Sequence, residues 1–279
     1  MSVLKKSVAI AAIMIMALSL VLVGCSSNKA PEEPKTTGSA EAPKEAEVKL
    51  ITPGTLTIGS DCDYPPFIYM EGEKVGGFEY ELMTAIGEEM GLQIQYLPPQ
   101  NFDSLIASVA AATKMDIGVS SFTITDERKE LVDFCDPYFD SNQAAVAMKG
   151  AGFTSAMDFD GMTVGAQSGT TGADWVRENL PNATLKEFNQ TSEGLASLVA
   201  GDIKCLYFDE PVAVEQVSKT YTDCEIIEVI PTGEQYGFAV SKDNAKLKEA
   251  VNKALRTLID NGTYGEIFAK YFEFEPTIK

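Results

Sequence analysis

The sequence contains no histidine in its 279 residues. This absence excludes Ser-His and Cys-His nucleophile pairs, histidine-ligated metal sites and histidine general bases. An enzyme that works through carboxylates stays possible, so the absence argues against catalysis without settling the question. Basic residues are also scarce, since 22 Lys and Arg stand against 41 Asp and Glu and give a formal charge of −19. A surface this acidic repels phosphate backbones, and nucleic acid is not expected as a partner.

Cysteine is rare, and its spacing is not that of a metal site. Besides Cys25, the chain has only Cys62, Cys135, Cys205 and Cys224, with no CxxC pair among them. No metal and no cofactor is therefore predicted. Four cysteines allow three full pairings, and the spacing does not choose between disulfides and buried free thiols. The 45% hydrophobic and 23% charged composition is that of a globular protein.

The N-terminus has the pattern of a secretory signal. Lys5 and Lys6 precede an apolar run of 16 residues, 8–23, which is shorter than the ~20 that span a bilayer as a helix. The run ends in Leu-Val-Gly-Cys, which resembles a bacterial lipobox. That likeness implies removal of residues 1–24 and acylation of Cys25, with palmitate-type chains each worth roughly 0.8 kcal/mol per buried CH₂. We expect a protein held outside the cytoplasm, at the membrane surface or in the periplasm, by its lipid alone.

The next segment is predicted to be a tether. Residues 26–49 are rich in Ala, Pro, Glu, Lys, Ser and Thr and have almost no large apolar side chain. Such a coil spans about 25–30 Å, enough to clear the lipid head groups. Loss of residues 1–24 removes two lysines, so the mature charge is 20 − 41 = −21.

From Thr55 onward, strand and helix patterns alternate. The first series comprises strand 56–60, an apolar helical stripe at 78–90 that stops at Gly91, strand 93–97, helix 102–109 and buried strand 115–122. The second series begins with strand 162–167, a turn at 168–172, a helix through Trp175 to Leu180 and strand 185–188. A helix capped by Ser192 and ending at Gly201 follows, and then strand 203–209 and a helix near 211–218. Segment 226–230, strand 236–240 and helices 247–258 and 264–272 complete the series. Both series follow an α/β order.

Two α/β series with leftover C-terminal helices predict two doubly wound lobes. Lobe 1 is expected to comprise residues 50–141 and 241–279, and lobe 2 residues 142–240, with hinge crossings near Ser141 and Ser241. Ligands of open α/β sheets bind beyond the carboxyl ends of the strands. The ligand is therefore expected in the cleft between the lobes.

Six collinear motifs carry a family resemblance across residues 54–275. They are GTLTIGSDCDYPPF, GGFEYELMTAIGEEMG, DIGVSSFTITDERKELVDFCDPYF, VGAQSGTTG, DEPVA and NGTYGEIFAKYF. Together they resemble family 3 of the bacterial solute-binding proteins. The resemblance implies a two-lobed type II periplasmic-binding fold, a free polar amino acid as ligand, a monomer, and delivery to the permease subunits of an ABC transporter.

The same resemblance implies which residues contact the backbone groups of the amino acid. Arg128 would clamp the α-carboxylate through its planar fork, and Asp209 would receive the α-ammonium. Ser121 and Thr123 would offer hydroxyl and backbone groups to both, and Thr171 would start a helix whose dipole favours the carboxylate. The set is completed by Ser120 and Thr170. Read without the family, Arg128 fits a surface turn, and Thr171 and Asp209 fit helix caps.

Four further positions would read the ligand side chain. Tyr64 and Phe102 would sandwich its aliphatic part, although Phe102 also fits a core position. Asp61 and Gln167 would meet its polar end. Basic or neutral polar ligands, such as lysine, arginine, glutamine or cystine, are therefore expected ahead of glutamate or aspartate.

Two other functions fit the same fold. A periplasmic dehydratase acting on prephenate-like acids would use Asp61 or Asp209 as its catalytic carboxylate. A sensory or adhesive surface lipoprotein would use the module for binding only. Simple capture is favoured, because Arg128 and Asp209 match the two charges of a free amino acid. No catalytic residue is therefore predicted.

Overall fold

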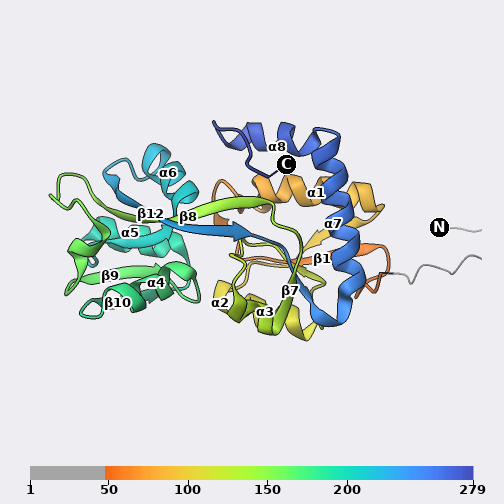
Figure 1. Ribbon diagram of the computed structural model, residues 1–279, viewed down its shortest axis with the longest axis horizontal. Helices are drawn as coiled ribbons and strands as arrows, with labels where there is room; N and C mark the ends of the chain where they lie inside the picture. The colour runs from red at the N-terminus through yellow and green to blue at the C-terminus, as the bar shows by residue number, and fades with distance from the viewer. Residues whose placement is uncertain (1–47, 279) are drawn as a thin grey trace, which may run out of the picture. The chain divides into compact units, whose positions relative to one another are not determined.

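The computed structural model describes residues 48–278, which fold as an α/β protein with two five-stranded sheets (Figure 1). The first sheet has the strand order β5-β1-β6-β13-β7. Its strands are β1 (Thr55–Gly59), β5 (Gln93–Tyr96), β6 (Ile117–Gly118), β7 (Val132–Phe134) and β13 (Ala239–Ser241). Strand β1 runs parallel to both β5 and β6, while β13 is antiparallel to its neighbours.

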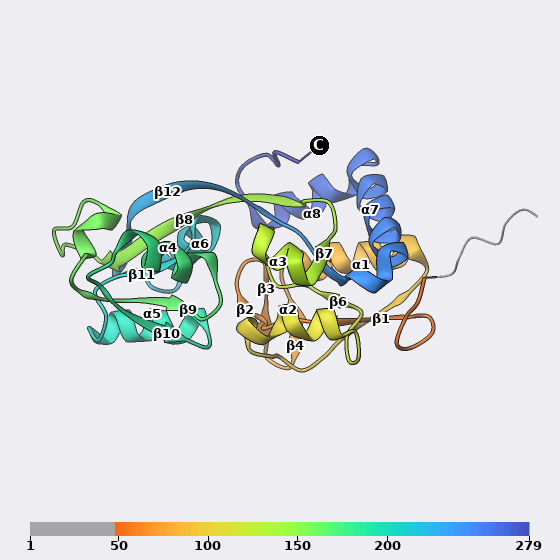
Figure 2. The same ribbon diagram turned by 60° about the horizontal axis from the view of Figure 1, so that its bottom comes forward.

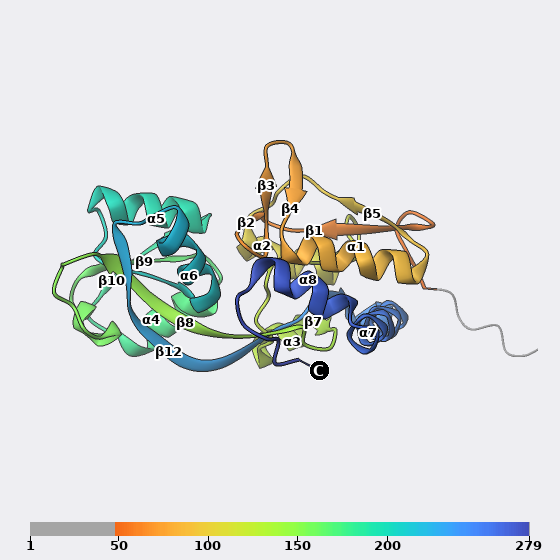
Figure 3. The same cartoon turned by 90° about the horizontal axis from the view of Figure 1, so that it is seen from above.

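Several helices and a small sheet belong with the first sheet and form lobe 1. The helices are α1 (Phe78–Met90), α2 (Phe102–Ala111), α3 (Asp126–Leu131), α7 (Ala245–Asp260) and α8 (Thr263–Tyr271), with the 3₁₀ turn η2 (Lys242–Asn244). The small sheet comprises β2 (Asp63–Tyr64), β3 (Ile68–Glu71) and β4 (Lys74–Gly76). Helices α1, α7 and α8 contact one another, as Figure 3 shows from above.

The second sheet, of order β10-β9-β11-β8-β12, forms lobe 2 with its helices. Its strands are β8 (Phe139–Met148), β9 (Thr163–Gln167), β10 (Thr184–Phe188), β11 (Leu206–Asp209) and β12 (Cys224–Tyr236). The helices are α4 (Thr171–Asn179), α5 (Thr191–Ala200) and α6 (Glu210–Lys219), with the 3₁₀ turn η1 (Ala156–Phe159). Strand β9 runs parallel to β10 and β11, and β8 is antiparallel to β11 and β12.

The long strands β8 and β12 connect the two lobes. They pair antiparallel from Met148 and Cys224 at one end to Phe139 and Tyr236 at the other, and Figure 2 shows them side by side along this course. The rings of Phe139 and Tyr236 pack against Phe67, with ring centroids 4.8 and 5.3 Å away. These edge-to-face contacts fix one end of the strand pair to lobe 1.

Helix α1 illustrates how the sequence pattern sets the structure. The predicted apolar stripe is buried, with Phe78, Leu82 and Ile86 fully inaccessible to solvent. The helix ends at Gly91, which has φ 68° and thus the left-handed conformation that glycine adopts without strain. The stripe and its stop were both predicted correctly.

Three sequence predictions are wrong in detail. Helix α5 begins at Thr191, so Ser192 lies in its first turn instead of capping it. The strand expected at 115–122 is limited to Ile117–Gly118, because the chain then turns through Ser121, which has φ 48°. The expected strand at 236–240 is interrupted, with Tyr236 ending β12 and Ala239 starting β13.

The return crossing also lies earlier than the expected boundary at Ser241. Ala239 and Val240 already pair with Gly118 and Ile117 of lobe 1. Together with Ser241 they form β13, which pairs with β6 on one side and with β7 on the other. The predicted signal segment, Cys25 and the tether up to residue 47 lie outside the described residues.

Within residues 48–278, no helix is long and apolar enough to cross a membrane. All four cysteines in this range are buried and unpaired. Burial raises the pKa of the Cys62 thiol to about 11, so it is protonated at neutral pH. In this part of the chain the cysteines pack as small apolar side chains.

Candidate functional site

All eleven residues predicted to contact the ligand line one pocket. They are Asp61, Tyr64, Phe102, Ser120, Ser121, Thr123, Arg128, Gln167, Thr170, Thr171 and Asp209. The free volume inside is about 10 Å³, no more than a single water molecule needs. A larger cavity of about 760 Å³, at Leu50 and Met90, contains none of the eleven.

The pocket lies where parallel strands of both sheets end. In lobe 1, β1 and β6 are parallel neighbours, and Asp61 and Ser120 follow their carboxyl ends. In lobe 2, β9 and β11 are parallel neighbours that end in Gln167 and Asp209. Parallel strands bring their carboxyl ends to one edge, so each sheet contributes a short row of polar side chains. The two rows meet in the pocket.

Asp61 is a buried carboxylate whose hydrogen-bond donors are neutral. Its side chain accepts from Ser120 Oγ at 2.6 Å and from Gln167 Nε2 at 3.0 Å, and it is 2% exposed. Burial raises the pKa of Asp61, and the two hydrogen bonds partly oppose that rise. No Lys or Arg of residues 48–278 lies within 4 Å of this carboxylate.

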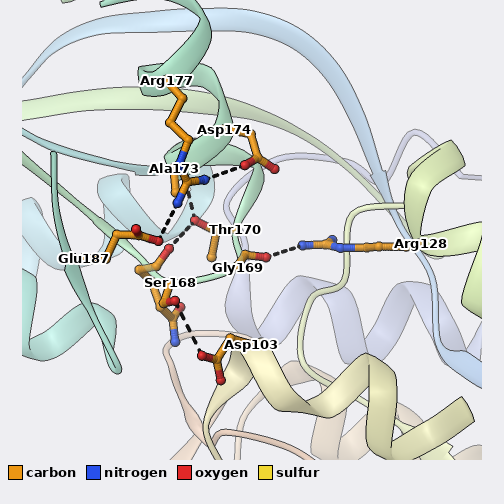
Figure 4. A network of polar contacts seen from close by, with 10 residues as sticks. Asp103, Arg128, Ser168, Gly169, Thr170, Ala173, Asp174, Arg177 and Glu187 are labelled. Atoms are coloured by element: carbon orange, nitrogen blue, oxygen red, sulfur yellow. Dashed lines mark hydrogen bonds and ion pairs between the residues drawn. The ribbon is translucent and has the colours of Figure 1, made fainter.

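The guanidinium of Arg128 reaches from lobe 1 toward lobe 2. Its Nη1 donates to the carbonyl of Thr123 at 2.8 Å. Its Nη2 donates to the carbonyl of Gly169 at 2.9 Å (Figure 4). It lies 5.5 Å from the centroid of the Phe102 ring, which itself stacks on Phe122. Burial lowers the pKa of Arg128, and nearby acids oppose that shift. Within residues 48–278, these contacts use two of the five N–H groups of the guanidinium.

Asp209 occupies the N-cap position of α6, but its side chain makes no capping hydrogen bond. Its carboxylate instead accepts from Gln143 Nε2 and from the hydroxyl of Tyr236, while its backbone N–H donates to Tyr64 Oη at 3.2 Å. Burial, then the charge of Glu234, raises the pKa of Asp209 to about 7. A neighbouring cation would lower this pKa and stabilise the charged form.

Thr170 and Thr171 begin helix α4. The Thr170 hydroxyl caps the helix, because it accepts from Ala173 N at 3.3 Å and donates to Gln167 O at 2.7 Å. The capping interpretation is thus correct for Thr170, one residue before the position to which the sequence assigned it. Helix α4 directs its N-terminus toward the pocket, where its dipole favours an anion.

A buried acid that the sequence analysis did not single out, Glu79, holds the pocket residue Ser121 in place. Glu79 is fully buried in the first turn of α1, and its Oε1 accepts from Ser121 N at 2.8 Å and Ser121 Oγ at 3.1 Å, and from Tyr138 Oη. Burial raises the pKa of Glu79 to about 7. These bonds hold Ser121 in its left-handed conformation. The polar residue beside Phe78 in an otherwise apolar stripe is the sequence signal.

Two more polar residues at the site were also missed. Gln143 of β8 donates to both Asp209 and Glu234, and Glu234 of β12 accepts from the Thr123 hydroxyl at 2.8 Å. Both belong to the strands that connect the lobes. Nothing in their local sequence marks them, because their position depends on strand pairing over 91 residues.

The comparisons with known proteins agree with this arrangement. Residues 56–274 match the model of the bacterial extracellular solute-binding proteins, family 3. The chain belongs to this family. Among curated relatives, this family 3 protein is 30% identical over 232 residues to the L-cystine-binding protein TcyJ of Escherichia coli (strain K12), covering 82% of this chain and 86% of that one. It is 33% identical over 227 residues to the arginine-binding extracellular protein ArtP of Bacillus subtilis (strain 168), covering 79% and 87%.

Solved structures show the same fold. An ancestral arginine-binding protein bound to arginine matches this family 3 protein with a TM-score of 0.75 and 35% identity, over 78% of this chain and 98% of that one. The ancestral amino acid-binding protein AncCDT-1, described as a precursor of cyclohexadienyl dehydratase, matches with a TM-score of 0.73 and 31% identity, over 79% and 96%. The two-lobed type II periplasmic-binding fold predicted from the sequence is thereby confirmed.

Proposed function

We propose that this protein captures a free amino acid with a cationic side chain between its lobes and delivers it to an ABC importer. The observation that carries the proposal is Asp61, a buried carboxylate bonded only to neutral donors within the described residues. A buried charge is stabilised when an opposite charge pairs with it. The cationic end of arginine, lysine or ornithine supplies that charge.

The charge balance of the site supports the same choice. Two acids, Asp61 and Asp209, line the pocket, and two more, Glu79 and Glu234, bond to residues that line it, whereas Arg128 is the one basic residue of that lining. A neutral amino acid adds one charge of each sign and leaves the acidic excess unchanged. A dibasic amino acid adds one further positive charge and reduces it, whereas glutamate or aspartate would increase it.

The α-carboxylate of the ligand would bind between Arg128 and the start of helix α4. The free N–H groups of the guanidinium and the N-terminus of α4 at Thr171 both favour an anion there. The α-ammonium would bind at Asp209, whose pKa of about 7 would then fall. Tyr64 and Phe102 would pack on the methylene groups.

Entry of the ligand requires the lobes to separate. The pocket has about 10 Å³ of free space, and its walls are joined directly by Asp61–Gln167 and Arg128–Gly169 hydrogen bonds. An amino acid would replace these direct bonds with bonds to itself. Within residues 48–278, the chain passes from one sheet to the other only through β8 and β12. This strand pair is the proposed hinge.

The remaining features of the proposal concern location and partners. We propose a lipoprotein whose signal peptide is removed at Cys25, and which works as a monomer outside the cytoplasm with its permease subunits in the membrane. The lipobox pattern at Leu22 to Cys25 and the extracellular nature of the family support this. Labelling of cells with a palmitate analogue should mark the protein and fail with Cys25→Ser.

We also propose that the protein binds its ligand without catalysing a reaction. The curated relatives described above are named for binding, and Arg128 with Asp209 matches a substrate that carries an ammonium. Prephenate lacks that group. Release of a keto acid from prephenate by the purified protein, measured by mass spectrometry, would overturn this part of the proposal.

A thermal-shift screen tests the binding proposal directly. A ligand that binds only the folded state adds about 2.7 kcal/mol at a hundredfold excess over Kd, so the melting temperature should rise. Arginine, lysine and ornithine should give the largest shifts, followed by glutamine and cystine. A larger shift with glutamine or cystine would contradict the cationic assignment. No shift with any amino acid at millimolar concentration would contradict binding itself.

A further inference from the structure

Glu234 is directed into the site by an irregularity in strand β12. The pairing with β8 shifts between Ile230 and Glu234, and Gly233 in this stretch has φ 65°. Bulges of this kind change the direction in which a side chain points. The side chain of Glu234 is half-buried and forms hydrogen bonds to residues from both lobes.

The contacts of Glu234 connect three parts of the molecule. Its Oε2 accepts from Thr123 Oγ1 of lobe 1 at 2.8 Å and from Thr171 Oγ1 of lobe 2 at 3.1 Å. Gln143 Nε2, on the neighbouring hinge strand, lies 3.2 Å from each carboxylate oxygen and also donates to Asp209. Glu234 therefore bridges the lobes at the pocket wall.

The carboxylate fixes the direction of both hydroxyl groups. An ionised carboxylate can only accept hydrogen bonds, so each threonine hydroxyl donates its single proton to Glu234. The oxygen atom of Thr123 then has lone pairs alone to offer the pocket that it lines, whereas Thr171 Oγ1 also accepts from Gln143 Nε2 at 3.2 Å. Lone pairs suit an ammonium group and repel a carboxylate.

We propose that Glu234 is a positioning residue for amino acid recognition. It holds the hydroxyl of Thr123 as an acceptor for the ligand α-ammonium, and its second bond, to Thr171, connects that hydroxyl to the start of α4 across the closed cleft. The inference rests on the proposed function and extends it, because Glu234 is not part of the ligand pocket and instead lines the adjacent hollow that Thr123 and Thr171 share with it.

The decisive variant is Glu234→Gln, which keeps the size of the side chain. Its amide has an NH₂ donor in place of one acceptor oxygen. If the amide oxygen accepts from both hydroxyls, the NH₂ group must face the NH₂ group of Gln143, which is also a donor. The proton of the Thr123 hydroxyl should then turn toward the ligand ammonium. We expect the affinity for arginine to fall about tenfold.

A ligand without the α-amino group separates this role from a structural one. The probe pair is arginine and 5-guanidinopentanoate, which differs from arginine only by lacking that group. Glu234→Gln should weaken arginine binding in calorimetry and leave the affinity for 5-guanidinopentanoate within about twofold. If the screen shows another amino acid to bind most tightly, that amino acid and its desamino form replace the pair.

Glu228→Gln is the matched control. Glu228 is also half-buried on β12, but its carboxylate accepts from Ser155 Oγ and Ala156 N within lobe 2. Its substitution should leave both affinities unchanged. A variant Thr123→Val tests the route of action, because adding Glu234→Gln to it should cost less than Glu234→Gln costs alone.

The outcomes are distinct. Equal losses for the two probes, or no loss for arginine, would overturn the role of Glu234. Full additivity of Glu234→Gln and Thr123→Val would overturn its action through Thr123. If the unmodified protein binds no amino acid at all, the proposed function fails first and the inference fails with it.

Discussion

The carboxylate of Asp61 accepts a hydrogen bond of 3.0 Å from the amide of Gln167, and this bond joins the polar edge of one sheet to that of the other. Gln167 has no freedom to rotate, since its Nε2 also donates to Asn189 O and its Oε1 accepts from Thr191 Oγ1, at 3.0 and 3.1 Å. The amide is thus fixed with its donor toward Asp61. This orientation leaves Asp61 as the acceptor that a ligand side chain would meet.

Asp61→Asn should remove the preference for cationic ligands. The substitution keeps the shape of the side chain and removes its charge, and a hydrogen bond to a charged group is worth about 1.5–3 kcal/mol. The affinity for arginine should therefore fall at least tenfold, and the affinity for glutamine should change much less. Calorimetry with both ligands measures the ratio. An unchanged ratio would place the ligand side chain elsewhere in the cleft.

Arg128→Lys should abolish tight binding although it keeps the charge. Lysine has a single ammonium and lacks the planar fork that donates to a carboxylate through two parallel bonds. We expect a loss of a hundredfold or more, with the melting temperature of the unliganded protein little changed. Arg177→Lys is the control, because Arg177 lies on nearby α4 with exposed ion pairs to Asp174 and Glu187 (Figure 4). The control should bind like the unmodified protein.

Affinity should increase as the pH rises through about 7. The fold raises the pKa of Asp209 from 3.8 to about 7, so below that value most molecules carry a proton where the ligand ammonium must bind. Binding then releases this proton, and Kd should improve by up to tenfold per pH unit until about pH 7. The same shift means that folded Asp209 retains a proton that the unfolded chain has lost. Its contribution to stability therefore falls as the pH rises from about 4 to 7.

Glu79 must be separated from Asp209 in this experiment, since its pKa is also raised to about 7. In Asp209→Asn the pH dependence of binding should disappear along with most of the affinity. In Glu79→Gln, which can still accept from Ser121 through its amide oxygen, the dependence should remain. If the pH dependence is lost in Glu79→Gln and kept in Asp209→Asn, the titrating acid is Glu79 and the assignment to Asp209 is wrong.

The parts of this protein that the sequence predicted are those set by local pattern. The helical stripe of α1 and the carboxyl ends of β1 and β9 follow from residue periodicity and turn chemistry, and they place Asp61 and Gln167 at facing edges. Glu234 could not be found this way, because its partner Thr123 is 111 residues away and the contact depends on a bulge. Glu79 was missed for a different reason, since a charged residue on a helix is usually exposed.

One hydrogen bond between the lobes lies outside the pocket, at helix α5. Asp63 of β2, in lobe 1, accepts from the backbone N–H of Ser192 at 3.0 Å, in the first turn of α5 in lobe 2. The N-cap residue of this helix, Gln190, makes no side-chain capping bond. Asp63 therefore satisfies a free donor of α5 from the opposite lobe, and it can do so only while the lobes are closed.

Asp63→Ala should therefore destabilise the closed form without removing any contact to the ligand. A helix cap is worth about 0.5–2 kcal/mol, so the ligand should dissociate roughly 2- to 30-fold faster, while the association rate should stay the same because the open lobes do not use this bond. Stopped-flow measurement of both rates distinguishes these effects. Asp158→Ala is the control, since Asp158 accepts from the backbone N–H groups of Thr154 and Ser155 within lobe 2 alone. It should lower stability and leave dissociation unchanged. Equal dissociation rates in Asp63→Ala and the unmodified protein would show that the cap does not hold the lobes together.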